Sequence, residues 1–349
     1  MYRIIFLGSP DFAIPSLETL VEDPRFDVVG VFSQPDKKVG RKQILTPSDV
    51  KKRALELNLN VYTPEKINTP ENVELIKSLN PDFLFTAAYG KIISPEILAI
   101  PQIEAINLHG SLLPKYRGAS PIQSSLLNGD KETGVTYIRM VEKMDAGKMF
   151  YKTKIQIEKE DNAATLFEKI AELGRKHTPD VLAKIANGEL KEVKQNEEEV
   201  SYCKKISKAN GEIDWEKETA EEIYNKIRAY TPWPGCFTTF QGKILKIIKA
   251  DFNKIEKSPL RGLGGVKTQV EQGFPTTPVS SAVADYQNFR QNDAINNKNG
   301  TVFQKNFTTQ ITTKSGNLIP QIIQLEGKKA MSIEDFIKGK PEFVGATLG

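Results

Sequence analysis

Short apolar runs alternate with amphipathic stretches through the first half of the chain. Residues 3–7 and 28–32 are short and mostly apolar, as buried strands are, and residues 12–21 between them place apolar side chains at helical spacing. The apolar pattern returns at residues 82–87 and 103–108. Strands that alternate with helices in this order predict a Rossmann-like α/β domain with a parallel-rich sheet.

Two further strands and a helical region complete this domain. Apolar residues return at 134–141 and 149–157, on either side of a short polar loop. Beyond them we expect a helix that is capped by Asp161 and ends at Leu173, followed by a last helix that ends near Gly188.

A polar and charged stretch at residues 191–208 marks the change to a second domain. Such stretches are typical of linkers, so residues 1–190 are predicted to form the first domain and residues 209–349 the second. Short strand patterns and one helix pattern make up the second domain, which favours a small OB-like β-barrel. The helix pattern covers residues 219–228, and the strand patterns cover residues 237–240, 243–249, 301–303, 308–312 and 318–325.

Residues 258–299 interrupt the strand pattern of the second domain. Glycine, glutamine, asparagine, threonine and serine are frequent there, apolar residues are few, and no helical period is present. A segment with so little apolar surface cannot offset the conformational entropy that is lost on folding. We therefore expect a disordered insertion at these positions.

Composition narrows the class of protein. With 349 residues, of which 39% are hydrophobic and 26% charged, the chain is typical of globular proteins. The net charge of +4 permits a polyanionic partner without requiring one. Cys203 and Cys236 lack the spacing of metal ligands, so neither a disulfide framework nor a zinc site is expected. No apolar stretch reaches the length of a signal peptide or a membrane span, which predicts a cytoplasmic protein.

The strand at residues 103–108 leads into a pair of polar side chains. Asn107 and His109 are two residues apart, so they lie on the same face if the strand continues. Ligands of parallel sheets bind beyond the carboxyl ends of the strands, and imidazole is well suited to proton transfer near neutral pH. The pair is therefore a candidate catalytic site, although a histidine in this place can also do no more than cap a loop.

Two other positions are candidates for the same cleft. Residues 87–91 end a neighbouring strand, and Gly90 permits a close approach of the backbone to a ligand. Asp145 lies in the loop between two predicted strands. It is either an ordinary turn residue or the carboxylate that orients or deprotonates a histidine-based site, and the spacing leaves both interpretations open.

A long basic connection follows the second predicted strand. Residues 33–47 contain Lys37, Lys38, Arg41 and Lys42. Loops of this length inside a compact domain are usually functional or mobile, but a run of positive charge can equally be a solvated surface.

Asn107, His109, the loop at residues 111–114 and Asp145 together resemble the folate-dependent formyltransferases. The resemblance extends over nearly the whole chain and breaks at residues 258–299. Further matching stretches are residues 8–12, 33–36, 87–91, 118–123, 232–234 and 327–331.

The resemblance assigns roles to the candidate residues. An asparagine, a histidine and an aspartate form the catalytic site of that family, which implies this role for Asn107, His109 and Asp145. Arg139 and Lys143 depart from the family pattern, because they place positive charges shortly before the aspartate. The predicted folate-binding residues are Ser111, Leu112, Leu113, Pro114, Ala88, Tyr89 and Gly90.

The members of this family that act on tRNA, which the chain resembles more narrowly, bind it through a basic loop and through their small β-domain. The residues that match the basic loop, and are therefore predicted to contact the acceptor arm, are Lys37, Lys38, Arg41 and Lys42.

The implied reaction is transfer of the formyl group of 10-formyltetrahydrofolate to the amino group of methionyl-initiator tRNA, without a metal, a membrane or an obligate protein partner. One alternative is a folate-dependent formyltransferase that acts on an amino sugar nucleotide or another small amine. The basic loop and the second domain argue against it, since a small substrate requires neither. The other alternative is a non-catalytic RNA-binding protein, against which the presence of Asn107, His109 and Asp145 argues.

Overall fold

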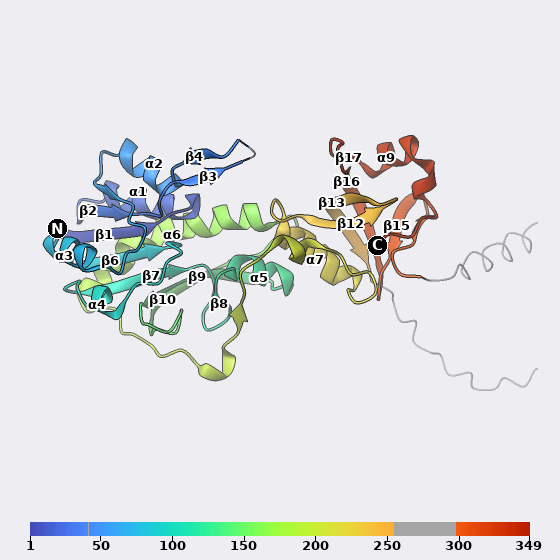
Figure 1. The fold of residues 1–349 in the computed structure, drawn as a ribbon. Coiled ribbons are helices and arrows are strands. Elements are labelled where there is room, and N and C mark those ends of the chain that lie inside the picture. The colour runs from blue at the N-terminus through green and yellow to red at the C-terminus, as the bar shows by residue number, and fades with distance from the viewer. Residues whose placement is uncertain (41, 255–297) are drawn as a thin grey trace, which may run out of the picture. The chain divides into compact units, whose positions relative to one another are not determined.

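The computed structural model describes residues 1–40, 42–254 and 298–349, which group into two compact units (Figure 1). The first unit comprises residues 1–210 and 228–234, and the second comprises residues 211–227 and 235–349. Arg41 and residues 258–297 of the predicted insertion lie outside the described residues.

A seven-stranded sheet forms the centre of the first unit, in the order β10-β9-β7-β6-β1-β2-β5. The first five of these strands along the chain are mutually parallel, β9 is antiparallel to β7, and β10 is antiparallel to β9. The parallel-rich, Rossmann-like sheet is thus confirmed. Its strands are β1 (Tyr2–Gly8), β2 (Phe26–Phe32), β5 (Val61–Tyr62), β6 (Phe83–Ala87), β7 (Glu104–His109), β9 (Glu132–Arg139) and β10 (Met149–Gln156).

The strand order reverses at β1. From β1 the chain builds outward through β2 and β5, and it then returns to the other side of β1 to add β6 and β7. Such a reversal leaves a crevice at the carboxyl ends of the two central strands, which is where open α/β sheets bind ligands.

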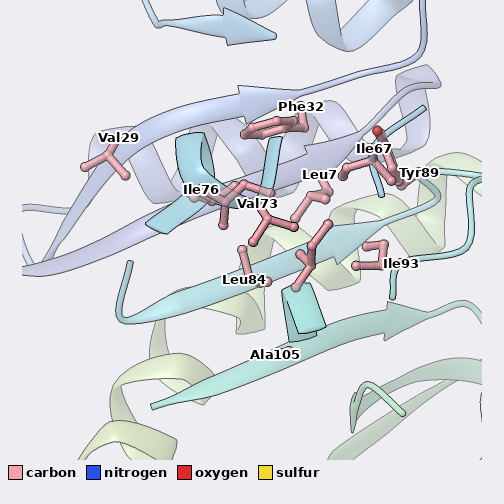
Figure 2. Close-up of a cluster of buried hydrophobic side chains, with 12 residues drawn as sticks. Leu7, Val29, Phe32, Ile67, Val73, Ile76, Leu84, Tyr89, Ile93 and Ala105 are labelled. Atoms are coloured by element: carbon pink, nitrogen blue, oxygen red, sulfur yellow. The ribbon is translucent and has the colours of Figure 1, made fainter. Parts of the chain in front are cut away.

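Helices cover the sheet, and their apolar faces form its core. Val73 and Ile76 of α3 pack with Leu7 of β1, Phe32 of β2 and Leu84 of β6 in one buried cluster (Figure 2). Ser48, Thr69 and Ser94 each cap a helix by accepting a bond from a backbone N–H. The helices of this unit are α1 (Ile14–Glu22), α2 (Asp49–Glu56), α3 (Pro70–Ser78), α4 (Pro95–Leu98), α5 (Pro121–Leu127) and α6 (Ala163–Ala186).

Helix α6 corrects the prediction of two successive helices. It runs unbroken from Ala163 to Ala186, and its cap is Asn162 rather than Asp161. The Asn162 side chain accepts a bond from the backbone N–H of Thr165 at 3.2 Å, and Thr165 Oγ1 accepts one from the N–H of Asn162 at 3.0 Å. Pro179 lies inside the helix, and the helix continues through it because its neighbours on that face are buried.

The basic connection at residues 33–47 also differs from the expectation. It contains a short antiparallel hairpin of β3 (Lys37–Val39) and β4 (Ile44–Thr46) instead of an irregular loop. Lys38 and Lys42 are exposed on this hairpin.

Residues 191–208, which the sequence suggests as a linker, belong to the first unit. Within them, β11 (Tyr202–Cys203) pairs in parallel with β8 (Arg117–Gly118). This stretch therefore adds a strand to the loop region that follows β7.

Antiparallel strands dominate the second unit, as the sequence predicts. The sheet has the order β12-β13-β16-β15-β14, and β17 pairs with β16. Its strands are β12 (Cys236–Phe240), β13 (Lys243–Asn253), β14 (Val302–Lys305), β15 (Thr308–Thr312), β16 (Asn317–Leu325) and β17 (Met331–Ser332). The unit also contains α9 (Ile333–Gly339) and all but the last three residues of α7 (Ala220–Tyr230). Over the part of the chain that the structure describes, no helix is long and apolar enough to cross a membrane.

Candidate active site

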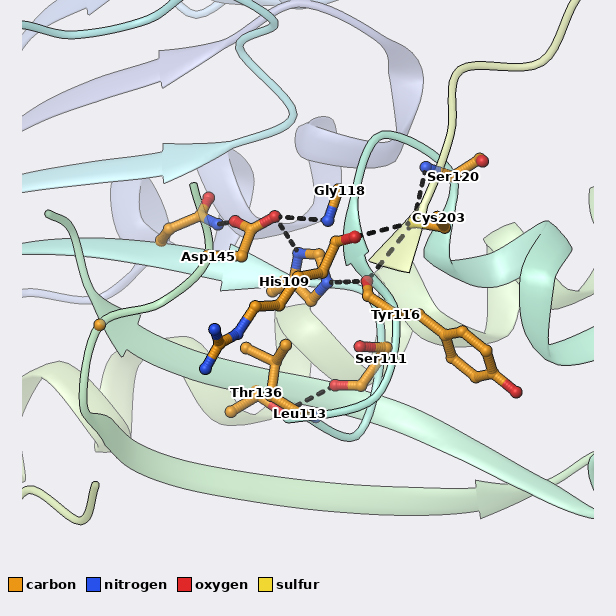
Figure 3. Close-up of polar contacts among 12 residues, drawn as sticks. His109, Ser111, Leu113, Tyr116, Gly118, Ser120, Thr136, Asp145 and Cys203 are labelled. Carbon is orange, nitrogen blue, oxygen red and sulfur yellow. Dashed lines mark hydrogen bonds and ion pairs between the residues drawn. The ribbon is translucent and has the colours of Figure 1, made fainter. Parts of the chain in front are cut away.

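His109 ends β7, and hydrogen bonding fixes the orientation of its imidazole ring. The side chain is only 5% exposed, and Nε2 lies 2.9 Å from the carbonyl oxygen of Tyr116. A carbonyl oxygen can only accept, so Nε2 carries a proton. The other ring nitrogen, Nδ1, lies 3.6 Å from Oδ2 of Asp145 (Figure 3). The Asp145 carboxylate therefore faces the ring nitrogen that does not contact the Tyr116 carbonyl.

Asp145 joins the polar groups of the site. Its Oδ2 accepts a bond from the backbone N–H of Gly118 at 2.9 Å, and its Oδ1 lies 3.4 Å from Nδ2 of Asn107. The residue has a φ of 51°, in the left-handed region that non-glycine residues adopt at some cost. The structure thus brings Asn107, His109 and Asp145 together, which the sequence spacing could not establish.

A cavity of about 630 Å³ opens beside these three residues. Ala88, Tyr89 and Gly90, at the end of β6, contribute to its wall. Three buried polar atoms of its lining residues, Thr86 Oγ1, the Tyr89 hydroxyl and Gln123 Oε1, have no hydrogen-bond partner within the described residues. Buried polar atoms without partners are costly, so all three are suited to a polar ligand.

The loop at residues 111–114 is bonded to β9 and lies outside the lining of the cavity beside His109. The side chains of Ser111 and Leu113 are fully buried, and Ser111 Oγ donates to the carbonyl of Lys115 at 2.6 Å. Thr136 Oγ1 accepts a bond from the N–H of Leu113 at 3.1 Å and donates to the carbonyl of Ser111 at 2.7 Å. These contacts hold the loop to β9, while Leu112, Leu113 and Pro114 line a separate cavity of about 250 Å³. Their role in folate binding stays a prediction.

Backbone groups of the site escape sequence analysis. The carbonyl of Tyr116 contacts His109, and the N–H of Gly118 contacts Asp145. Tyr116 and Gly118 take part through the backbone alone, so their residue types do not indicate this role. Thr86 is different, because it is paired with Asn107 across the neighbouring parallel strands. A polar residue at a strand end beside the candidate asparagine was a signal that could have found it.

The titratable neighbours of the site are held in their neutral forms. Burial raises the pKa of the Tyr89 hydroxyl to about 12. Burial also raises the pKa of the Cys203 thiol, which lies against the carbonyls of Tyr116 and Arg117. A thiol with a raised pKa is a poor nucleophile, so Cys203 is not suited to covalent catalysis.

Arg139 is neutralised by neighbouring carboxylates. Its guanidinium contacts Glu104, and Nη1 lies 3.3 Å from Oε2 of Glu192. Lys143 is exposed. In the described ranges, no three histidine, cysteine, aspartate or glutamate side chains gather as they would around a metal ion.

Comparisons with known proteins identify the family of the chain. Two family models match the chain: Formyl transferase over residues 2–182, and Formyl transferase, C-terminal domain over residues 205–341. Among solved structures, the N-formyltransferase of Helicobacter canadensis in complex with folinic acid and dTDP-3-aminofucose shares the fold with a TM-score of 0.58. It is 19% identical and matches 92% of this chain and 99% of its own.

Curated relatives match over their full length. A methionyl-tRNA formyltransferase of Listeria innocua is 40% identical over 340 residues, covering 97% of this chain and 96% of the relative. A methionyl-tRNA formyltransferase of Bacillus subtilis is 38% identical over 349 residues, covering 100% of this chain and 98% of the relative. The chain therefore belongs to the formyl transferase family.

Proposed function

We propose that this chain transfers the formyl group of 10-formyltetrahydrofolate to the α-amino group of methionyl-initiator tRNA, giving formylmethionyl-tRNA for translation initiation. Similarity to methionyl-tRNA formyltransferases over the full length supports the substrate. The single observation that carries the chemistry is the contact of Asp145 with both His109 and Asn107 beside the cavity.

A reduced folate fits the residues that line the cavity. Thr86 Oγ1 and Gln123 Oε1 offer polar atoms to its heterocycle or amide groups, and both are buried without partners among the described residues. The backbone at Gly90, where φ is 76°, adds a wall without a side chain. When bound, the folate supplies a formyl group on a nitrogen that must leave with a proton.

The side chains of the site can move the protons and stabilise the charge that this reaction requires. The neutral amine attacks the formyl carbon, a new C–N bond forms, and negative charge develops on the formyl oxygen. The donors for that oxygen are Asn107 Nδ2 and Nδ1 of His109. Asp145 is placed to accept the proton that the amine loses, and His109 can return a proton to the departing nitrogen.

The exposed lysines of the β3–β4 hairpin are proposed to contact phosphates of the tRNA acceptor arm, together with Arg41, which lies outside the described residues. Lys38 and Lys42 have exposed side chains, and Lys37 contacts Gln34. Contacts between lysines and phosphates release counterions, so they weaken as the salt concentration rises.

The double variant Lys38→Ala, Lys42→Ala is expected to raise the KM for tRNA by about tenfold. A plot of the logarithm of the binding constant against the logarithm of the salt concentration should become shallower by about one to two units of slope. Folate affinity should stay within a factor of two. Steady-state kinetics at several salt concentrations measure both effects. The control is Lys176→Ala with Lys184→Ala, two exposed lysines of α6. Equal losses in tRNA use and folate binding, or equal effects in the control, would contradict the assignment.

The substrate itself is tested by offering two amines with the same donor. Methionyl-initiator tRNA and dTDP-3-aminofucose are each incubated with the protein and 10-formyltetrahydrofolate, and the formylated products are quantified. We expect formylation of the tRNA alone. Formylation of the amino sugar alone would favour the small-amine alternative, and folate-independent tRNA binding without any product would favour an RNA-binding protein.

A further inference from the structure

The stretch at residues 193–203 lies against the loops that carry the site. Val193 forms a bridge with Met149, the residue at which β10 begins. At the other end, the carbonyl of Ser201 accepts a bond from the N–H of Arg117 at 2.8 Å, ahead of the β11–β8 pair. The stretch thus connects the chain that leaves the Asp145 loop with the chain that contains Gly118.

Gln195 is buried, whereas its neighbours in the sequence face solvent. It is 8% exposed, whereas residues 193, 194 and 196–199 are all exposed. Burying an amide is unfavourable unless its hydrogen-bonding groups are satisfied. Gln195 Nε2 donates to the carbonyl oxygens of Asp145 at 2.7 Å and Gly147 at 2.8 Å. The amide therefore uses both of its N–H groups on the backbone of the Asp145 loop.

Arg117 holds the other end of this amide. Its Nε donates to Gln195 Oε1 at 3.0 Å, and its Nη2 pairs with Oε1 of Glu197 at 2.7 Å. The Arg117 side chain is fully buried, while Glu197 reaches solvent. A buried guanidinium with partners of this kind has a fixed position, because loss of Glu197 would leave buried charge unpaired and loss of Gln195 would leave a buried N–H without a partner.

These contacts close a ring around Asp145. Arg117 is followed by Gly118, whose N–H donates to the Asp145 carboxylate, and Gln195 bonds to the Asp145 carbonyl. The backbone and the carboxylate of one residue are thereby held by two neighbouring segments that are themselves bonded together. Asp145 has a left-handed φ of 51°, and these bonds oppose its relaxation to a more common conformation.

We infer that Gln195 and Arg117 are positioning residues, which hold the Asp145 carboxylate in contact with His109 and Asn107. Neither lines the cavity beside His109, so both act through Asp145 rather than on a bound substrate. This role rests on the proposed function only for its effect on rate, because the geometry that it fixes exists without any substrate.

The variant Gln195→Glu separates positioning from packing. A glutamate keeps the size of the side chain and can still pair with Arg117, but it cannot donate to the carbonyls of Asp145 and Gly147. We expect the single-turnover formylation rate to fall by about tenfold to a hundredfold, with folate affinity and thermal midpoint little changed, because small displacements of catalytic groups have large effects on rate. The matched control is Asn196→Ala, the exposed neighbour.

Two further measurements keep the outcome unambiguous. In an Asp145→Asn background, Gln195→Glu should lower the rate by less than twofold, since its effect is transmitted through the missing carboxylate. Independently of activity, amide hydrogen exchange of residues 142–147 should rise by about tenfold or more in Gln195→Glu and not in Asn196→Ala. Unchanged hydrogen exchange of residues 142–147 in Gln195→Glu would overturn the inference, whichever amine the protein formylates. If the protein formylates tRNA, a double variant whose rate loss equals the product of the two single losses would also overturn it.

Discussion

Replacing Asp145 with asparagine is expected to lower the rate of formyl transfer by about a thousandfold while leaving the fold intact. Oδ2 of Asp145 faces two donors, the N–H of Gly118 at 2.9 Å and His109 Nδ1 at 3.6 Å, and Oδ1 faces the amide of Asn107. An asparagine has one oxygen and one NH₂ group, so either orientation points donors at a donor. It also removes the carboxylate that is proposed to accept the amine proton.

Single-turnover kinetics at saturating folate and tRNA measure this loss. The control is Glu172→Gln, which makes the same chemical change at an exposed position of α6 and should leave the rate within a factor of two. A loss of less than tenfold in Asp145→Asn, with an unchanged thermal midpoint, would remove Asp145 from the catalytic site.

Gly118→Ala is expected to damage both stability and activity. A Cβ at this position would lie 2.3 Å from the carbonyl oxygen of Cys203, and the φ of Gly118 is 123°, which side chains rarely allow. The strand pair β8–β11 must therefore open, and the N–H of Gly118 must move away from Asp145. We expect the free energy of unfolding to fall by about 2–4 kcal/mol, and the folded fraction to have lost most of its formylation rate.

Gly188→Ala provides a matched comparison for this effect. Gly188 also has a positive φ, of 73°, but a Cβ there would meet no atom within 4 Å. Gly188→Ala should lower the free energy of unfolding by only about 1 kcal/mol, which is the cost of the left-handed backbone alone. Chemical denaturation and single-turnover assays of the two variants separate backbone strain from the close approach to Cys203. Equal effects of the two substitutions would show that the close approach has no consequence.

Periodicity was sufficient to predict most of the fold. Buried strands such as β1, β6 and β7 are mostly apolar runs. A turn at Gln241–Gly242 joins β12 to β13 in a hairpin, as the sequence predicts. The helix α6 shows where local signals mislead. Gly174 and Pro179 weaken its helical propensity, but burial of the face that carries them sustains one continuous helix.

The sequence indicates the candidate side chains of the site but not how they contact one another. Asn107 and His109 share a face because strands alternate, whereas the contact of Asp145 with them depends on how a loop returns over the sheet. Gln195 was hidden for a related reason. It lies in a polar stretch with the composition of a linker, and nothing local distinguishes a buried glutamine from the exposed residues beside it.

His109, with Asn107 and Asp145, is proposed to catalyse the transfer of a folate-borne formyl group to methionyl-initiator tRNA. The most direct test is the single-turnover rate of this reaction in the wild type and in His109→Ala, with folate affinity measured alongside. We predict formylated tRNA from the wild type, and a rate lower by about a thousandfold in His109→Ala at unchanged folate affinity. A His109→Ala variant that formylates the tRNA at a rate within tenfold of the wild type would contradict this account.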